Sequence, residues 1–500
     1  MNLIKKFQNL DKYGKIAVII IVLGIVLRFS LAVLHSISGD ACWQLSNARY
    51  FGQHLSLPTF EQFGRDEPFW APPLFHIFAG LSYALGSVFS DSLGNLLMKL
   101  ISPLLGSLSL IVFYLLAKHL LDRKIAAYAL FFYTFIPLQI DYSIYSYVDG
   151  TVSFFSLLSV YLLLRGRMIL SGISAGFAIL SKYNGIFILP VIIFILFLKN
   201  KDKIIAINKS LVVGCIALAL GSLWFIRNWL VLGNPVWPFL NGIFNGYESA
   251  AFVTQQTGFI VLDRLFDFSG LTTIYLGIFG VPDGNIQTLL FYPIQHLALL
   301  FSLWIIATII FSIPFIIGLF SKNKNRMLLL IWTLSFCVLA GIYILNATWS
   351  VSRFLLPAFP AVALLWALGL EKMKDLSLFR YVLVLLILIA CGFVFSIALK
   401  INLAAQSWHE YDDDFSWVQQ NTPQNSILIS SGQCISYYTH RQTYPAYSEN
   451  IGKADYVWIN QEFRLDTTSI IDDSLLQSIQ QEGSLIYENE ETLNSIYKIK

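Results

Sequence analysis

The chain has 500 residues, of which 56% are hydrophobic, 15% aromatic and only 13% charged, and its net charge is +3. Soluble proteins are about half apolar and about a quarter charged, so this composition excludes an ordinary soluble domain and predicts a polytopic membrane protein. The basic residues are dispersed along the chain and form no dense patch, which argues against a nucleic-acid partner.

The first apolar run follows four lysines within the first 15 residues, and no cleavage site of small residues comes after it. A secretory signal peptide carries such a site. We therefore expect a first membrane span that is retained.

Runs of about 20 apolar residues are long enough to cross a bilayer. The sequence predicts about eleven such helices, near 15–35, 96–117, 125–140, 150–164, 168–181, 184–198, 208–227, 292–318, 327–345, 353–370 and 380–399. Lys and Arg concentrate in every second connection, which marks that side as cytoplasmic. The opposite side then carries the loop 36–95, the segment 228–291 and the carboxyl-terminal tail.

The segment 73–90 is apolar but interrupted by polar and small residues. Counting it as a span would place Lys118, Arg123 and Lys124 outside, against the positive-inside bias. We therefore expect an interfacial helix in this first external loop. Parts of 240–291, where aromatic residues alternate with Gly, Asn and Asp, favour the same interpretation.

After about residue 400 the composition changes to Ser, Gln, Asn, Tyr and acidic residues. Short β-like runs occur at 426–430, 456–460 and 485–487, and helical patterns at 412–421 and 472–482. The acidic run Asp412–Asp414 favours a helix start over a metal cluster. The predicted organisation is an all-α membrane domain over 1–400 and a small extracytoplasmic α/β domain over 401–500.

The chain contains five cysteines, Cys42, Cys215, Cys337, Cys391 and Cys434. Five cysteines in so long a chain do not make a disulfide scaffold, and no CxxC pair indicates a metal or redox site. We expect all five to be packing residues.

Several short motifs occur in order on the predicted external side. They are Ser38–Asp40 after the first span, Asn47–Tyr50, Phe69–His76, Tyr147–Asp149, Ser181–Gly185, Arg227–Trp229, Gly233–Pro238 and Ser352–Pro357. Over residues 1–400 this series resembles type C (GT-C) membrane glycosyltransferases, in the branch of polyprenyl-phosphate-mannose protein mannosyltransferases and aminoarabinose lipid A transferases. Many members carry an Asp-Glu pair where this chain has Asp40 followed by Ala41, so the subfamily and the acceptor stay open.

Asp40 is the candidate catalytic residue. It directly follows the first span, at the depth where the phosphate of a lipid-linked sugar would lie. An acceptor hydroxyl that attacks the anomeric carbon needs a base to take up its proton, and such a base accelerates the reaction by roughly 10² to 10⁴. The alternative is an interfacial or helix-capping Asp without catalytic function.

Three isolated basic residues, Lys182, Arg227 and Arg353, lie at external ends of predicted helices. Preorganised cations in a water-poor site stabilise the negative charge of a departing lipid phosphate. We therefore expect them to bind the donor phosphate. The alternative is that they are membrane anchors, whose long side chains reach toward the headgroups.

Three further carboxylates are candidate substrate ligands. Asp149 could hold a sugar hydroxyl or a cation, or only cap the helix that follows it. Asp66 and Glu67 could bind acceptor or metal, or only start an interfacial helix. A divalent cation such as Mg²⁺ or Mn²⁺ would need several such oxygen ligands, and no spacing requires one, so a metal cofactor stays open.

The resemblance implies an inverting glycosyltransferase, a multi-pass protein of the cell membrane. It would move a sugar from a polyprenyl-phosphate donor to a protein, lipid or glycan acceptor on the non-cytoplasmic face. The first alternative is a transporter or flippase of lipid-linked or polar substrates, which would place its ionisable residues at mid-membrane. The second is a noncatalytic scaffold that presents its tail to a partner.

Overall fold

The computed structural model describes residues 7–61, 63, 67–248, 275, 278–279, 298–344, 352–430, 433–460 and 473–499. The chain divides into two compact units. The helical unit comprises Met1–Val33 with Ser102–Lys400, and the α/β unit comprises Leu34–Ile101 with Ile401–Lys500. The α/β unit therefore joins the first predicted external loop to the carboxyl-terminal segment. Asp66 and most of the predicted segment 228–291 lie outside the described residues.

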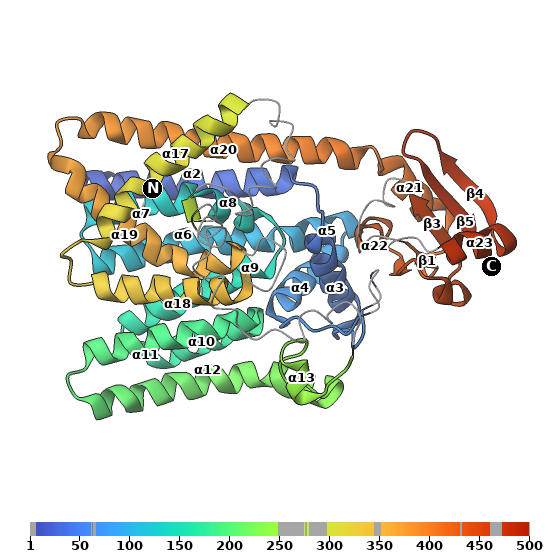
Figure 1. Cartoon of the computed structure of the whole chain (residues 1–500), viewed down its shortest axis with the longest axis horizontal. Helices are drawn as coiled ribbons and strands as arrows, with labels where there is room; N and C mark the ends of the chain where they lie inside the picture. Colours follow the sequence, from blue (N-terminus) through green and yellow to red (C-terminus); the bar gives the residue numbers. More distant parts are fainter. Residues whose placement is uncertain are drawn as a thin grey trace. The chain divides into compact units, whose positions relative to one another are not determined.

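The helical unit consists of apolar helices, which Figure 1 shows running alongside one another. They are α2 (Lys12–Leu34), α6 (Ile101–Leu120), α7 (Arg123–Phe135), α8 (Pro137–Ile144), α9 (Val148–Leu164), α10 (Met168–Ser181), α11 (Ile188–Lys199), α12 (Lys203–Leu232), α13 (Asn241–Phe244), α17 (Ala298–Leu319), α18 (Arg326–Ile344), α19 (Phe359–Lys372) and α20 (Phe379–His409). Short 3-10 turns η1 (Tyr183–Phe187), η5 (Ser352–Ala358) and η6 (Met373–Asp375) connect them. Each of the eleven predicted ranges contains a helix.

The number of membrane spans is a separate question. Among the described residues, five stretches are long and apolar enough to cross a bilayer: Lys12–Leu34, Asp91–Leu120, Lys203–Leu232, Arg353–Asp375 and Phe379–Asn402. Helices α7 and α8 would form a sixth span, bent by 59°. The other predicted spans are shorter apolar helices, so the protein is an integral membrane protein but the count of eleven is not confirmed.

The ends of these helices follow local chemistry. The Asp202 carboxylate caps α12 by accepting from the backbone N–H groups of Ile204 and Ile205. Gly233 ends the same helix with a φ of 70°, in the left-handed region that glycine adopts at little cost. The bend between α7 and α8 falls at Pro137, which has no N–H to continue the helix.

In the α/β unit, three helices come from the first external loop: α3 (Asp40–His54), α4 (Leu74–Ser87) and α5 (Asp91–Lys99). Helix α4 occurs where an interfacial helix is predicted. The carboxyl-terminal segment contributes α21 (Asp412–Asn421), α22 (Gln433–Thr439), η7 (Ser448–Lys453), α23 (Asp473–Glu482) and strands β1 (Ile427–Ile429), β2 (Gln442–Tyr444), β3 (Tyr456–Asn460), β4 (Ser484–Asn489) and β5 (Asn494–Lys498).

The five strands form one mixed sheet in the order β2-β1-β3-β5-β4, with β1 parallel to β2 and β3 and the other pairs antiparallel. Alternate residues serve opposite faces, as the pleat requires. Ile429 and Val457 pack with Leu475 of α23 on one face. Leu428 and Trp458 pack on the other with residues of α21 and α22. The predicted small α/β domain is thus a sheet covered by helices on both faces.

The acidic run at the start of α21 is explained by the fold. Asp412, Asp413 and Asp414 occupy the first turn of the helix, where the helix dipole favours negative charge. The buried carboxylate of Asp414 accepts hydrogen bonds from side chains of the β4–β5 hairpin, among them Tyr487 Oη at 2.5 Å. The run is a helix start and a hairpin anchor.

Candidate active site

Asp40 is the first residue of α3. The chain enters this helix through Gly39, whose φ of 57° lies in the left-handed region that favours glycine. The dipole of the helix favours a negative charge at this end. Asp40 is half-buried, so the carboxylate remains accessible in part. This placement is compatible both with a catalytic carboxylate and with an acid that only stabilises the helix.

Helix α3 is polar in sequence and yet almost enclosed. Every residue from Ala41 to Arg49 is buried. The Trp43 indole N–H donates to the Glu61 carboxylate, and its ring stacks on Phe69 with centroids 5.7 Å apart. These contacts come from the loop that follows α3. Tertiary packing therefore fixes the helix that begins with Asp40.

Of the two candidate acids Asp66 and Glu67 in the first external loop, the structure describes only Glu67. Glu67 is buried, and its carbonyl accepts from the backbone N–H of Glu61 at 2.7 Å. It does not begin a helix, because α4 starts only at Leu74. Asp66 lies outside the described residues. Glu61, which sequence reasoning missed, is fully buried and carries no motif signal.

His76 lies in the aromatic packing beneath α3. It is fully buried, with ring centroids 5.0 Å from Phe69 and 5.7 Å from Trp43. Neither ring nitrogen has a hydrogen-bond partner among the described residues. Burial lowers the pKa of His76 from 6.5 to about 3, because the charged imidazolium would lose its hydration. His76 is therefore a neutral packing residue at pH 7.

The other four candidates, Asp149, Lys182, Arg227 and Arg353, belong to the helical unit. Asp149 Oδ1 and Lys182 Nζ form an ion pair of 2.7 Å. Asp149 is 1% exposed and Lys182 16% exposed. Helix α9 is preceded by Tyr147, and no side chain caps it, so the capping role considered for Asp149 is wrong. The Lys182 ammonium also lies 3.9 Å from the centroid of the Phe354 ring.

Arg353 is next in the chain to Phe354, whose ring the Lys182 ammonium contacts. It precedes Phe354 in η5, and its guanidinium carbon lies 5.3 Å from the centroid of the Tyr147 ring. The hydroxyl of Ser153 on α9 donates to the carbonyl of Leu356 at 3.2 Å, which fastens η5 to α9. The structure thus brings Asp149, Lys182 and Arg353 together through the contact of η5 with α9.

Arg227 connects to the same group through a hydrogen-bonded chain. Its Nη1 donates to Asn228 Oδ1 at 2.8 Å, and Asn228 Nδ2 donates to the Tyr183 hydroxyl at 2.7 Å. Tyr183 directly follows Lys182. The guanidinium carbon of Arg227 also lies 4.8 Å from the Trp224 ring, which is what a membrane anchor would show as well.

Sequence reasoning missed a second acid–lysine pair in this neighbourhood. Lys400 Nζ lies 3.4 Å from Asp141 Oδ2 and 5.3 Å from the centroid of the Tyr145 ring. Tyr145 in turn makes an edge contact with Tyr147, the residue under Arg353. The sequence offered a weak indication for Asp141, because this acid lies in a predicted external turn. Nothing in the sequence distinguished Lys400, at the end of the last apolar run, from a membrane anchor.

Two buried polar groups in the neighbourhood of Lys182 are unsatisfied. Neither the amide nitrogen nor the amide oxygen of Asn184 has a hydrogen-bond partner within the described part of the chain, and the same holds for Oδ2 of Asp149. Buried polar groups in native proteins are nearly always paired. These atoms therefore have hydrogen-bonding capacity that no described residue uses.

A metal centre finds no support in the described residues. They contain no group of three or more His, Cys, Asp or Glu side chains that could hold an ion. Asp149 already has a lysine partner, which reduces the negative charge that a hard cation would need.

The two ends of the helical unit carry different connections. At one end Arg123 pairs with Asp11 at 3.2 Å and Lys124 with Glu371 at 2.8 Å. All four come from connections predicted on the cytoplasmic side. The cluster around Lys182 comes only from connections predicted on the other side. Each set of contacts therefore joins connections that the charge pattern assigns to the same side.

The expectation that all five cysteines are packing residues is wrong. Cys42 of α3 and Cys434 of α22 form a disulfide within the α/β unit, across 392 residues of sequence. Cys215, Cys337 and Cys391 are free. The error came from counting cysteines as one framework, because a single long-range pair leaves no spacing pattern in the sequence.

Comparison with known proteins places this architecture. Residues 71–226, under half of the chain, match the sequence model of the dolichyl-phosphate-mannose-protein mannosyltransferase family. No curated protein sequence matches the chain significantly. The structure of ArnT from Cupriavidus metallidurans bound to undecaprenyl phosphate is similar with a TM-score of 0.62 and 14% identity, over 97% of this chain and 98% of ArnT.

Two archaeal structures extend the comparison. The oligosaccharyltransferase of Archaeoglobus fulgidus in complex with Zn and sulfate is 14% identical, with a TM-score of 0.56 over 96% of this chain and 73% of its own. The oligosaccharyltransferase AglB from the same organism, with an inhibitory peptide and a dolichol-phosphate, is 15% identical, with a TM-score of 0.52 over 97% and 74%. At such identities the likeness establishes the fold. The predicted resemblance to type C membrane glycosyltransferases is confirmed at that level.

Proposed function

We propose that the protein is an inverting glycosyltransferase that moves a sugar from a polyprenyl phosphate to an acceptor hydroxyl on the non-cytoplasmic face of the membrane. The observation that carries this proposal is the gathering of Lys182 and Arg353, with Arg227 linked to them, at one end of a bundle of apolar helices. Such cations suit a lipid-borne phosphate. Structures of the same fold contain undecaprenyl phosphate and a dolichol-phosphate, which supports this donor class.

The residues take the following roles in the proposed reaction. The acceptor oxygen attacks the anomeric carbon as the bond from that carbon to the phosphate oxygen breaks, and one such displacement inverts the configuration. Asp40 takes up the proton of the acceptor hydroxyl. The electron pair of the broken bond stays on the lipid phosphate, where the cations stabilise the new charge.

Asp149 and Asn184 are proposed to bind sugar hydroxyls. Asp149 Oδ2 and the Asn184 amide are among the buried polar atoms without partners in the described part of the chain. A site with unpaired groups of this kind favours a substrate that supplies the missing hydrogen bonds. Glu67 remains a candidate residue for binding the acceptor. The acceptor group can be a protein, lipid or glycan hydroxyl.

The proposed orientation rests on the disulfide. Disulfides form and persist in oxidising compartments and are rare in the cytosol. Cys42 is two residues from Asp40, and Cys434 belongs to the carboxyl-terminal segment. Both regions are therefore proposed to face the non-cytoplasmic side, which agrees with the distribution of Lys and Arg in the connections.

A transporter or flippase is the second candidate. The buried pairs Asp149–Lys182 and Asp141–Lys400, together with the bend between α7 and α8, are features that transporters also use. The two functions differ in their products. A transporter moves its substrate intact, whereas a transferase forms a new glycosidic bond.

The test is a transfer assay with purified protein in lipid nanodiscs. Radiolabelled polyprenyl-phosphate sugars are supplied together with a membrane extract, and the products are separated and the anomeric configuration is determined. We expect label in a new acceptor-linked product of inverted configuration. A chelator arm shows whether a divalent cation is required. A parallel assay uses the protein in sealed proteoliposomes. Label that crosses their membranes with the donor intact, and never enters a product, would support the transporter and reject the transferase.

A further inference from the structure

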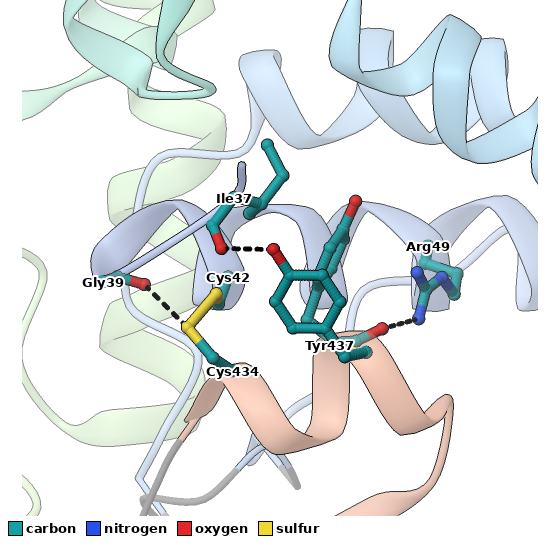
Figure 2. Close-up of a disulfide and its surroundings, with 7 residues drawn as sticks. Ile37, Gly39, Cys42, Arg49, Cys434 and Tyr437 are labelled. Atoms are coloured by element: carbon teal, nitrogen blue, oxygen red, sulfur yellow. Dashed lines mark hydrogen bonds between the residues drawn. A yellow bond between two sulfur atoms is a disulfide. The ribbon is translucent and has the colours of Figure 1, made fainter. Parts of the chain in front are cut away.

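The carboxyl-terminal segment is fastened to the helix that begins with Asp40. Helix α22 lies against α3 within the α/β unit, and Figure 2 shows three attachments between them. They reach α3 and its approach at Ile37, Cys42 and Arg49. The first two enclose Asp40 in the sequence, three residues before it and two residues after it.

The attachment after Asp40 is covalent. Cys42, fully buried, is bonded to Cys434 of α22. Cys434 Sγ also lies 3.9 Å from the carbonyl oxygen of Gly39, the residue before Asp40 (Figure 2). The attachment before Asp40 is the hydrogen bond from the Tyr438 hydroxyl to the carbonyl of Ile37, at 2.7 Å. The first turn of α3 is thus held from both sides.

The third attachment holds the second half of the same helix. Arg49 is 6% exposed, and its Nη1 donates to the carbonyl of Tyr437 at 2.9 Å. Its guanidinium carbon lies 4.9 Å from the centroid of the Tyr437 ring, and its Nη2 donates to Asn95 of α5 at 2.7 Å. Because α3 is attached at its first turn and again at Arg49, the helix is held against rotation as well as against displacement.

Helix α22 is itself a fixed part of the sheet domain. Ile435 lies in the core between the sheet and α21. The Tyr438 ring stacks on Phe415 of α21 with centroids 4.8 Å apart and planes 15° apart. Helix α22 therefore fixes the position of α3 relative to the sheet.

We propose that the carboxyl-terminal α/β domain is a positioning element for Asp40, with Cys434 and Tyr438 as positioning residues that hold the first turn of α3. This inference rests on the catalytic role proposed for Asp40. A displacement of about 1 Å in a reacting group can cost about 100-fold in rate. The disulfide and the Tyr438 hydrogen bond hold the turn that carries the carboxylate, and so they would prevent such a displacement.

The principal test is the double variant Cys42→Ala/Cys434→Ala, assayed in nanodiscs at a temperature well below its own Tm. We expect kcat to fall by about 10- to 100-fold, with the donor KM within about twofold of the wild type, because positioning acts on the transition state. Cys215→Ala is the matched control, since Cys215 is a free, exposed cysteine on α12. It should leave kcat and KM unchanged.

A milder variant covers the case in which the double variant does not fold. Tyr438→Phe keeps the disulfide and the stacking on Phe415 and removes only the hydrogen bond to Ile37. Loss of one such bond corresponds to a fall in kcat of about 2- to 10-fold, again without a change in KM. A lowered Tm with wild-type kcat in the variants that fold would overturn the proposal, since that result describes a purely structural attachment.

The two proposals fail in different ways. If the wild-type protein transfers no sugar from any donor, the proposed function is rejected, and with it the reason for positioning Asp40. If the wild type transfers sugar and the folded variants retain its kcat, only the positioning role is rejected.

Discussion

The two units hold their charged groups by different means. In the helical unit, buried carboxylates are paired with lysines across helices, as in Asp149–Lys182 and Asp141–Lys400. In the α/β unit, the half-buried Asp40 begins a helix that a disulfide and backbone hydrogen bonds hold in place. Charge pairing therefore holds these carboxylates in the first unit, whereas covalent and hydrogen-bonded attachment holds the helix of Asp40 in the second. Breaking an ion pair in the helical unit should accordingly change the free energy of unfolding, whereas loosening the attachment of α3 should change kcat.

The largest effect on stability is expected for Lys182→Met. The substitution leaves Asp149 buried without its partner, and breaking a buried pair in this way costs about 3–5 kcal/mol in the free energy of unfolding. The double variant Asp149→Asn/Lys182→Met removes the orphaned charge and should regain more than half of the loss. Chemical denaturation in detergent measures both. Equal loss in the single and double variants would show that the pair is not what stabilises this end of the unit.

For Arg353→Ala we expect weaker donor binding with little loss of stability. Hydrogen bonds to a charged group contribute about 1.5–3 kcal/mol, which corresponds to about a 10- to 100-fold rise in the Kd of the donor. Arg123→Ala is the matched control, because Arg123 is an exposed residue that pairs with Asp11 at the opposite end of the unit. An unchanged donor Kd in Arg353→Ala would remove Arg353 from the phosphate site.

His76 gives the α/β unit a predicted sensitivity to acid. Its pKa is lowered to about 3 in the folded protein, so between pH 6.5 and about 3 the unfolded chain binds a proton that the folded chain does not. Stability is therefore complete above pH 6.5 and falls as the pH decreases. The loss amounts to about 2 kcal/mol by pH 5.

His76→Phe should abolish that part of the pH dependence, because phenylalanine fills a similar volume in the same aromatic surroundings. His54→Phe, at an exposed position on α3, should keep it. The readout is the difference in free energy of unfolding between pH 7 and pH 5. A His76→Phe protein with the wild-type pH dependence would contradict the assignment.

The apolar helices could be predicted from the sequence because hydrophobic burial acts on each of them separately. The strands near 427, 456 and 485 could be predicted for a similar reason, since alternating residues serve two faces of one sheet. Helix α3 could not. Its residues are polar, and only contacts such as Trp43 with Glu61 and Arg49 with Tyr437 bury it. Such partners are distant in the sequence and leave no periodicity.

The site shows the same division. Lys182 and Arg353 stood out in the sequence because a cation at a predicted external helix end is unusual, and the structure places them against the neighbouring rings of Phe354 and Tyr147. Their role in binding the donor phosphate stays a prediction. The pairing of Lys182 with Asp149 and the disulfide at Cys42 could not, since both depend on which distant elements meet. The ion pair that holds Asp149, and the disulfide on which the proposed orientation rests, therefore became visible only in the structure.

The most direct measurement is the single-turnover rate of sugar transfer by Asp40→Asn, with donor binding determined on the same preparation. The matched control is Asp202→Asn, at a helix cap where asparagine serves as well as aspartate. We predict that Asp40→Asn binds the donor with a Kd within about twofold of the wild type and transfers sugar about 10²- to 10⁴-fold more slowly. Wild-type transfer by Asp40→Asn would contradict the assignment of this carboxylate as the base.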